Sequence, residues 1–130
     1  MRDEGGGMRA ERQQAMVLRT KQFALAVIRL YASLSRATVH QVLGRQVLRS
    51  ATSVGAHYRE ACRAKSNADF VSKIEGALQE LDETVYWLEL LRDSDSVEAA
   101  TVEPVAAEAN ELIAIFVTVS RSVKALSAAR

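Results

Sequence analysis

The stretch that decides the fold is residues 45–91, RQVLRSATSVGAHYREACRAKSNADFVSKIEGALQELDETVYWLELL. Apolar residues recur in it at spacings of three and four, first from Val47 to Ala61 and again from Phe70 to Leu91. This period places them on one face of a helix, so the stretch predicts two amphipathic helices. Ser66 stands between the two runs, three residues before Asp69, which is the spacing of a helix-capping box. We therefore expect helices over residues 38–64 and from Ser66 onward.

The same period continues on both sides of this pair. Residues 13–37 predict a first helix, in which Phe23, Val27 and Leu30 belong to the buried face. Residues 93–101 are polar and predict a loop, and Pro104 is tolerated only near a helix start, so the fourth helix is expected over 101–127. Its inward residues are Val105, Ala109, Leu112, Phe116, Val119, Val123 and Leu126. Helices of this length with short connections predict an all-α, antiparallel up-down-up-down four-helix bundle.

Composition indicates one domain. The chain has 130 residues, which suffices for a single core. We interpret residues 1–10, with their glycines, as a flexible leader and residues 11–130 as the bundle. No apolar run reaches the roughly 18 residues that a membrane span needs. The single cysteine, Cys62, excludes an internal disulfide and favours a reducing, cytoplasmic setting.

The net charge of +1 conceals two oppositely charged segments. Residues 9–65 hold eleven basic and two acidic residues, whereas residues 66–111 hold two basic and twelve acidic residues. A nearly neutral chain can therefore present a strongly basic surface.

The basic residues of the second helix form an arginine face, which spans about 80° of the helix circumference opposite the apolar side. It consists of Arg45, Arg49, Arg59 and Arg63. On the first helix, Arg29 and Arg36 lie one heptad apart. The planar guanidinium donors match phosphate oxygens, so these residues are candidates for nucleic-acid binding. The alternative is a salt-bridged surface, in which they pair with an acidic column on the third helix formed by Glu75, Asp82 and Glu89.

Two features are candidates for an oligomer interface. Ile113, Ile115 and Val117 make the apolar stripe of the fourth helix wider than one bundle needs. Trp87 projects about 120° from the core centre of the third helix. A large ring in such a position often anchors a second subunit. The alternative is a tryptophan that lies partly against a neighbouring helix of its own subunit.

A set of polar residues is expected to bond between helices rather than to react. Ser53, His57 and Glu60 share one flank of the second helix, and Glu80 and Glu83 lie on the third. A buried carboxylate among them requires a partner, which we expect to be an arginine of the facing helix. His57 is interpreted as a structural hydrogen-bonding residue, with a functional contact or a metal ligand as the alternatives.

Nothing in the sequence indicates catalysis. Di-iron bundles need Glu-x-x-His pairs, but Ala37 and Val54 stand three residues before the two histidines, His40 and His57. The chain lacks zinc-ligand spacing, a phosphate-binding glycine loop and a nucleophile elbow. Cys62 borders the apolar side of its helix and is interpreted as a core filler. We therefore expect no enzyme activity, no metal, no cofactor and no small-molecule substrate.

The polar and apolar residues of the two central helices also carry a family resemblance. The matching residues are Gln46, Arg49, Ser50, Ser53, Ala56, Tyr58, Glu60, Ala61, Ser66, Asp69, Phe70, Lys73, Glu80, Glu83, Thr84, Trp87 and Leu88. This pattern resembles the bacterial four-helix-bundle proteins encoded in intervening sequences of 23S rRNA genes, over about residues 23–126. The chain departs from it at His57, where such proteins typically carry asparagine.

The resemblance implies a cytoplasmic homopentamer in the form of a ring. Some related proteins are accessory subunits of diversity-generating retroelements, in which a basic pentamer works with a reverse transcriptase and RNA. The resemblance therefore implies RNA, or a reverse-transcriptase-type nucleoprotein, as a partner. Our hypothesis is a non-enzymatic oligomer that binds RNA or a nucleoprotein through its basic helix face. The alternative is a scaffolding oligomer that binds a protein and has no nucleic-acid role.

Overall fold

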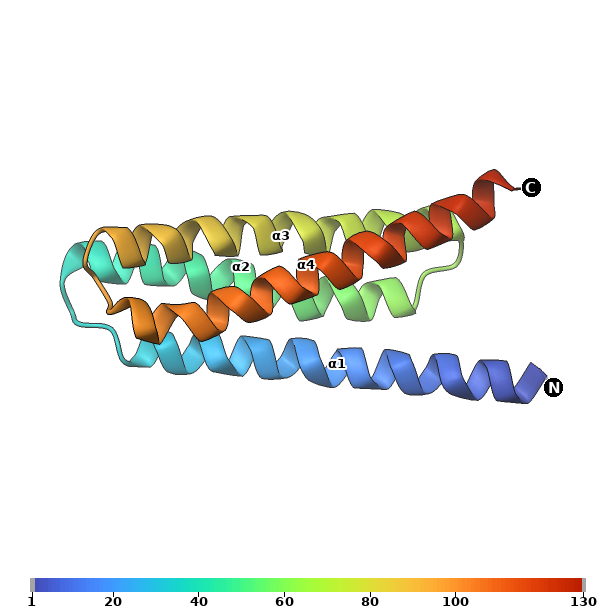
Figure 1. Cartoon of the computed structure of the whole chain (residues 1–130), viewed down its shortest axis with the longest axis horizontal. Coiled ribbons are helices and arrows are strands. Elements are labelled where there is room, and N and C mark those ends of the chain that lie inside the picture. The colour runs from blue at the N-terminus through green and yellow to red at the C-terminus, as the bar shows by residue number, and fades with distance from the viewer. Residues whose placement is uncertain (1, 130) are drawn as a thin grey trace.

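The computed structural model describes the backbone of residues 2–129 and the side chains of residues 9–129. It contains the helices α1 (Arg2–Ala32), α2 (Thr38–Cys62), α3 (Asn67–Asp93) and α4 (Ala99–Ala128). Successive helices run in opposite directions, so α1 begins and α4 ends at the same end of the molecule (Figure 1). Residues 2–129 contain no strand. The predicted all-α, antiparallel four-helix bundle is confirmed.

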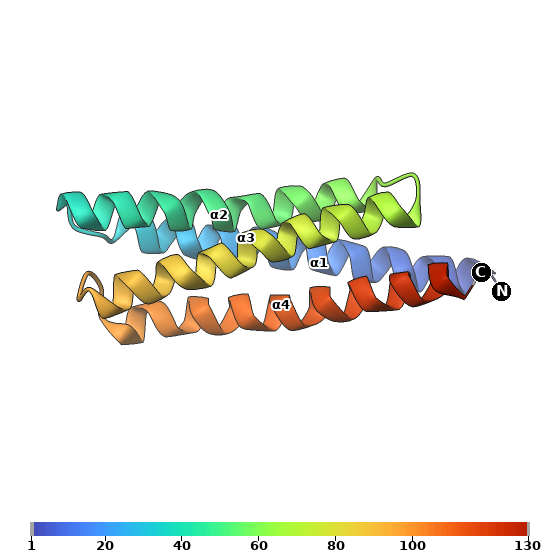
Figure 2. The same cartoon turned by 90° about the horizontal axis from the view of Figure 1, so that it is seen from above.

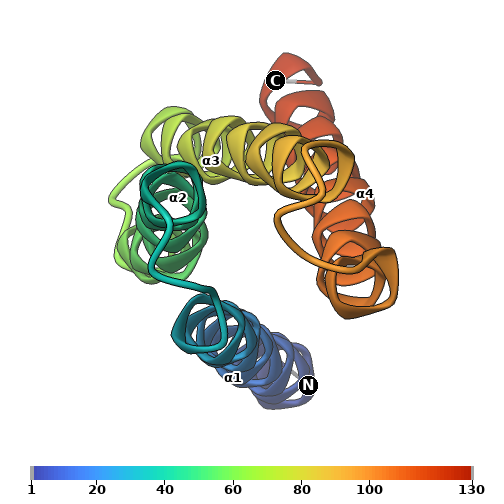
Figure 3. The same ribbon diagram turned by 90° about the vertical axis from the view of Figure 1, so that its left-hand side faces the viewer.

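The helices are arranged as an arc. Seen end-on, each helix packs against the next along the chain, and of the neighbouring helices α1 and α4 have the least contact (Figure 3). The view from above shows α2 and α3 at a shallow angle to each other, with α1 behind them and α4 alongside α3 (Figure 2). The largest fully buried side chains come from all four helices and include Val27, Val54, Leu81, Leu112 and Phe116. One core therefore extends along the arc.

The first helix differs from the prediction at both ends. It begins at Arg2, so residues 2–10 prolong α1 in the structure, where the sequence predicts a flexible leader. It ends at Ala32, before the predicted end at Ala37. The Ser35 hydroxyl accepts the Ala37 N–H at 3.2 Å, and the Ser35 carbonyl accepts the Gln41 amide at 2.7 Å. These local bonds replace helical ones and form the turn into α2.

The fourth helix also differs from the prediction. It begins at Ala99, so Pro104 lies in its second turn rather than its first. The ring removes one backbone donor there, but the acceptor it leaves, the Ala100 carbonyl, belongs to an exposed residue that water reaches. Leu126, predicted to point into the core, is 64% exposed. Figure 1 gives the reason: the last turns of α4 diverge from the other helices.

The turn between α2 and α3 follows the sequence closely. The Ser66 hydroxyl accepts the Asp69 N–H at 3.0 Å and caps α3, as predicted. Asp69 places a negative charge in the first helical turn, where the helix dipole stabilises it. Among the residues that the structure describes, no helix is long and apolar enough to cross a membrane.

Replacing Ser66 with alanine should lower the free energy of unfolding by about 1 kcal/mol, because the first turn of α3 loses its side-chain acceptor. Urea unfolding followed by circular dichroism measures this loss. Ser72→Ala is the matched control, since Ser72 is exposed inside α3 and makes no side-chain hydrogen bond among the described residues. Equal stability of the two variants would contradict a capping role for Ser66.

Candidate nucleic-acid interface

The arginine face lies on the outer surface of α2, away from the core. All of its residues are exposed. Within residues 9–129, Arg45, Arg59 and Arg63 have no ion-pair partner, so their guanidinium groups are available to a ligand. Arg63 caps the C-terminal end of α2, and it lies about 27 Å from Arg45 along the helix axis. The available cations therefore extend along the whole helix.

Arg49 does not share this availability. Its guanidinium donates to Glu83 at 2.6 Å and to Glu80 at 3.3 Å, both on α3. The hydrogen bond to Glu83, followed by the charge of Glu80, raises the pKa of Arg49 above its usual value. The side chain of Glu80 is only 18% exposed, so this carboxylate depends on the arginine for its compensation. Arg49 is thus committed to the α2–α3 interface.

Arg29 and Arg36 do not form the column that the sequence predicts. Arg29 lies in the last turn of α1 and is exposed. Arg36 lies beyond the end of that helix, in the turn that Ser35 organises. The predicted heptad relation between them fails because α1 stops at Ala32. Both are exposed cations at the end of the bundle where the chain turns from α1 into α2.

The acidic column of α3 does not neutralise the arginine face. Glu75 bonds to Lys124 of α4 at 2.6 Å. Asp82 and Glu89 are exposed, and neither has an ion-pair partner in the described part of the chain. Of the arginine face, only Arg49 is paired within residues 9–129, and its partners lie on the flank of α3 that faces α2.

The predicted polar residues meet along the α2–α3 interface. Glu60 and Lys73 form an ion pair at 3.2 Å, one helix supplying each partner. The Ser53 hydroxyl instead donates to the Arg49 carbonyl of its own helix at 2.8 Å. The carboxylates of Glu60, Glu80 and Glu83 therefore all bond to cations across this interface.

His57 packs into the same interface. Its Nε2 lies 3.9 Å from Glu80, which is beyond hydrogen-bond distance, and its Nδ1 is buried without a partner in residues 9–129. A Cβ at Gly76 would lie 3.0 Å from the imidazole ring, so the missing side chain at Gly76 makes room for it. The described residues contain no group of three or more potential metal ligands around His57 or elsewhere.

The residues predicted to form an oligomer interface are partly buried within their own subunit. Trp87, Ile113, Ile115 and Val117 are all half-buried. The Trp87 ring packs against the core, and its indole N–H is buried with no acceptor among the described residues. Trp87 therefore lies partly against its own subunit, and its place in an oligomer interface stays a prediction.

The sequence analysis did not identify an apolar surface on α1 that is more exposed than the four candidate interface residues. Leu18, Leu25 and Ile28 are 54%, 39% and 43% exposed, on the side of α1 opposite Phe23 and Val27. We call these three residues the α1 apolar surface. Leu18 and Leu25 are separated by one heptad, and this spacing could have predicted a second apolar face on the helix.

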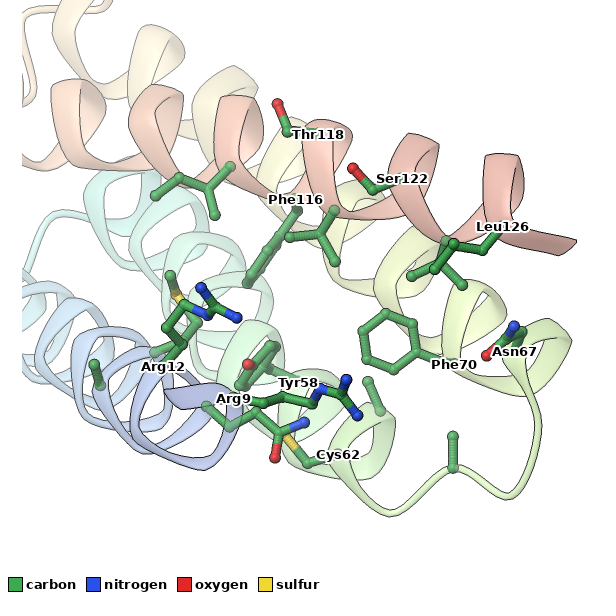
Figure 4. A pocket seen from close by; sticks show the side chains of 18 of the residues that line it. Arg9, Arg12, Tyr58, Cys62, Asn67, Phe70, Phe116, Thr118, Ser122 and Leu126 are labelled. Carbon is green, nitrogen blue, oxygen red and sulfur yellow. The ribbon is translucent and has the colours of Figure 1, made fainter. Parts of the chain in front are cut away.

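A groove between α1 and α4 was also missed. It has a volume of about 950 Å³ and opens where the two helices diverge (Figure 4). Tyr58 and Phe116 form its floor and stack with ring centroids 5.5 Å apart. Burial, followed by the neighbouring Cys62 thiol, raises the pKa of the Tyr58 phenol. Cys62, interpreted as a core filler, is half-buried and lines this groove.

Arg19, at the inner end of the groove, belongs to an ion-pair cluster between α1 and α4. Arg19 donates to Glu108 through two bonds of 2.7 and 2.8 Å and to Glu111 at 2.8 Å. The hydrogen bond to Glu108, followed by that to Glu111, raises the pKa of Arg19. This bidentate geometry fixes the spacing of the two helices at one level of the bundle. Beyond it, toward the start of α1, they separate.

The fold and surfaces define a class: a small antiparallel four-helix bundle with a basic outer helix. The profile of the family described as 23S rRNA-intervening sequence protein matches residues 12–118. The chain therefore belongs to the 23S rRNA-intervening sequence protein family.

A solved structure supports this assignment. The chain is 33% identical to a protein of unknown function from the S23 ribosomal protein family of Bacteroides thetaiotaomicron. The similarity covers 84% of this chain and 97% of the other, with a TM-score of 0.78. No curated protein matches the chain. The predicted family resemblance is confirmed.

Arg49→Ala should lower the free energy of unfolding by about 0.5–1 kcal/mol, because Glu80 loses its cation at a mostly buried position. Arg45→Ala is the matched control, since it removes the same side chain from the same helix where no partner exists in the described structure. Denaturant unfolding of both variants measures the difference. Equal losses would show that the α2–α3 ion pairs do not contribute to stability.

Proposed function

We propose that this protein is a non-enzymatic oligomer that binds RNA, or a nucleoprotein, through the outer face of α2. The observation that carries the proposal is the set of exposed arginines on that face, Arg45, Arg59 and Arg63, which lack carboxylate partners among the described residues. Membership of a family named for a 23S rRNA intervening sequence is consistent with an RNA partner.

The chemistry of this face favours backbone contact over base reading. Guanidinium groups bind phosphates in a bidentate manner, and three of them spaced along about 27 Å can follow a strand. The face offers small residues between the arginines, Thr52 and Ala56, and no aromatic ring on which a base would stack. Binding is therefore expected to tolerate sequence changes in the RNA and to depend steeply on salt.

Assembly would multiply this contact. A ring of identical subunits, five by family resemblance, presents the same arginines repeatedly, and effective concentration then strengthens a weak individual contact. The ion pairs of Arg49 reduce the number of arginines on the face that can contact phosphate. Arg49 is paired with Glu80 and Glu83, so phosphate contact is assigned to Arg45, Arg59 and Arg63, with Arg29 and Arg36 as flanking cations.

Reversing Arg45 and Arg59 to glutamate should abolish binding of a labelled structured RNA, measured by fluorescence anisotropy across a salt series. The slope of log affinity against log salt should fall by about 1 for each phosphate contact removed by neutral variants such as Arg59→Gln. The matched control is Lys21→Glu with Arg121→Glu, which changes the charge equally at exposed positions away from this face. Equal loss in the control would reduce the effect to net charge and contradict a defined site.

The alternative function, a scaffolding oligomer that binds a protein partner, is favoured by the α1 apolar surface. Exposed leucines one heptad apart on an outer helix face are typical of helix–helix association. They supply an interface that requires no nucleic acid. In this case the arginines would serve assembly or protein contact instead.

Leu18→Asp with Leu25→Asp should dissociate the oligomer, because aspartate cannot be buried unpaired in an apolar interface. Sedimentation equilibrium measures the mass, and circular dichroism checks that the helices persist. Gln22→Asp is the control, as Gln22 is an exposed polar residue between the two leucines on the same helix. An unchanged mass in the double variant would exclude the α1 apolar surface as the subunit interface.

A further inference from the structure

We propose that the groove between α1 and α4 binds an acidic amphipathic helix of a partner protein. The groove is the place where the four-helix arrangement remains open. From the Arg19 cluster toward the start of α1, the helices α1 and α4 diverge (Figure 1), and the groove opens between them (Figure 4). A helix seated there would complete the packing that a closed bundle supplies from within.

The walls of the groove match a helix in length and surface. Its lining extends along α1 from Arg9 to Arg19 and along α4 from Ile115 to Leu126, about 15 Å on each side, or about three helical turns. Val119 and Val123 of α4 are half-buried and Leu126 is 64% exposed, so the α4 wall presents an apolar edge. Apolar residues at helical spacing on a partner would bury this edge.

The charge of the groove specifies an acidic partner. Its lining includes Arg9, Arg12 and Lys65, all exposed, but no aspartate or glutamate. Among the described residues none of these three cations has an ion-pair partner, whereas Arg19 at the inner end is already paired. Figure 4 shows Arg9 and Arg12 extending from α1 over the apolar floor. Carboxylates on a partner helix would meet them at the rim.

Other ligand chemistries fit less well. Arg9 and Arg12 lie on one helix and Lys65 lies at the α2–α3 turn, so a small amphiphile with one carboxylate cannot engage all three. Nucleic-acid bases would need exposed aromatic faces, but Tyr58 and Phe116 stack on each other and are 7% and 0% exposed. The third aromatic residue of the lining, Phe70, is half-buried, so the groove offers no fully exposed ring. A helix with several carboxylates beside an apolar stripe could pair with the three cations and also cover the apolar edge of α4.

The probe is a labelled synthetic peptide of about four helical turns, with leucines along one face and glutamates along the other. Its counterpart replaces the glutamates with lysines. Fluorescence anisotropy with the full chain should give a dissociation constant in the micromolar range for the acidic peptide and none for the basic one. No binding of the acidic peptide, or equal binding of both, overturns the proposal.

Two variants locate the site. Arg9→Glu with Arg12→Glu tests the rim, and Lys21→Glu with Arg121→Glu is its charge-matched control outside the groove. Leu126→Asp tests the apolar edge at a position so exposed that folding is not at risk. Each test variant should weaken binding about tenfold or more, which corresponds to the loss of a substantial contact. Binding that survives both test variants lies elsewhere and overturns the proposal.

Two further outcomes identify a different occupant. If Leu126→Asp changes the mass of the protein in sedimentation, a second copy of the chain fills the groove, and the proposal is wrong. If RNA binding is lost in the Arg9→Glu, Arg12→Glu variant while the acidic peptide does not bind, the groove is a nucleic-acid surface, which also overturns it. The arginine face of α2 is unchanged in these variants, so failure here leaves the RNA proposal to its own test.

Discussion

The packing of α2 against α3 is the interaction on which the rest of the structure depends. At its centre the hydroxyls of Ser50 and Thr84 are hydrogen-bonded at 2.7 Å, and both residues are fully buried. Thr84 also donates to the Glu80 carbonyl at 2.8 Å, so this polar pair is satisfied inside the core. A buried pair of this kind favours one register of the two helices, because sliding would break the Ser50–Thr84 bond and leave each hydroxyl with only the bond inside its own helix.

The ion pairs on either side of this centre hold the same register. Arg49 reaches Glu80 and Glu83 on one side, and Glu60 reaches Lys73 farther along the same interface. The outer helices then pack against opposite edges of this pair. Gly55 of α2 allows close approach of α1, since a Cβ there would lie 3.2 Å from the Thr20 hydroxyl. Because each outer helix is positioned by the central pair, α1 and α4 need little direct contact with each other. They can therefore diverge, and the groove lies between them where they do.

Charge is divided among three uses in this molecule. Arg19, Arg49, Lys73 and Lys124 pair with carboxylates of other helices and contribute to the fold. The remaining arginines of α2 face outward, and the cations of the groove border an apolar floor. The two surfaces suit different partners, because one offers donors alone and the other combines donors with apolar area. An accessory protein that joins an RNA to another protein would use both.

The sequence by itself determined the helices, their alternation and the core. Apolar periodicity identified Val27, Val47 and Phe116 as buried, and the Ser66 cap followed from local spacing, because both depend on neighbours along the chain. Periodicity gives the direction of a side chain relative to its own helix, but not what faces it. Arg45 and Arg49 therefore look alike in the sequence, and only the position of Glu80 and Glu83 on α3 separates a free cation from a paired one. Leu126 and the groove illustrate the same limit: whether an apolar face is covered depends on where the neighbouring helix runs, and tertiary packing alone decides that.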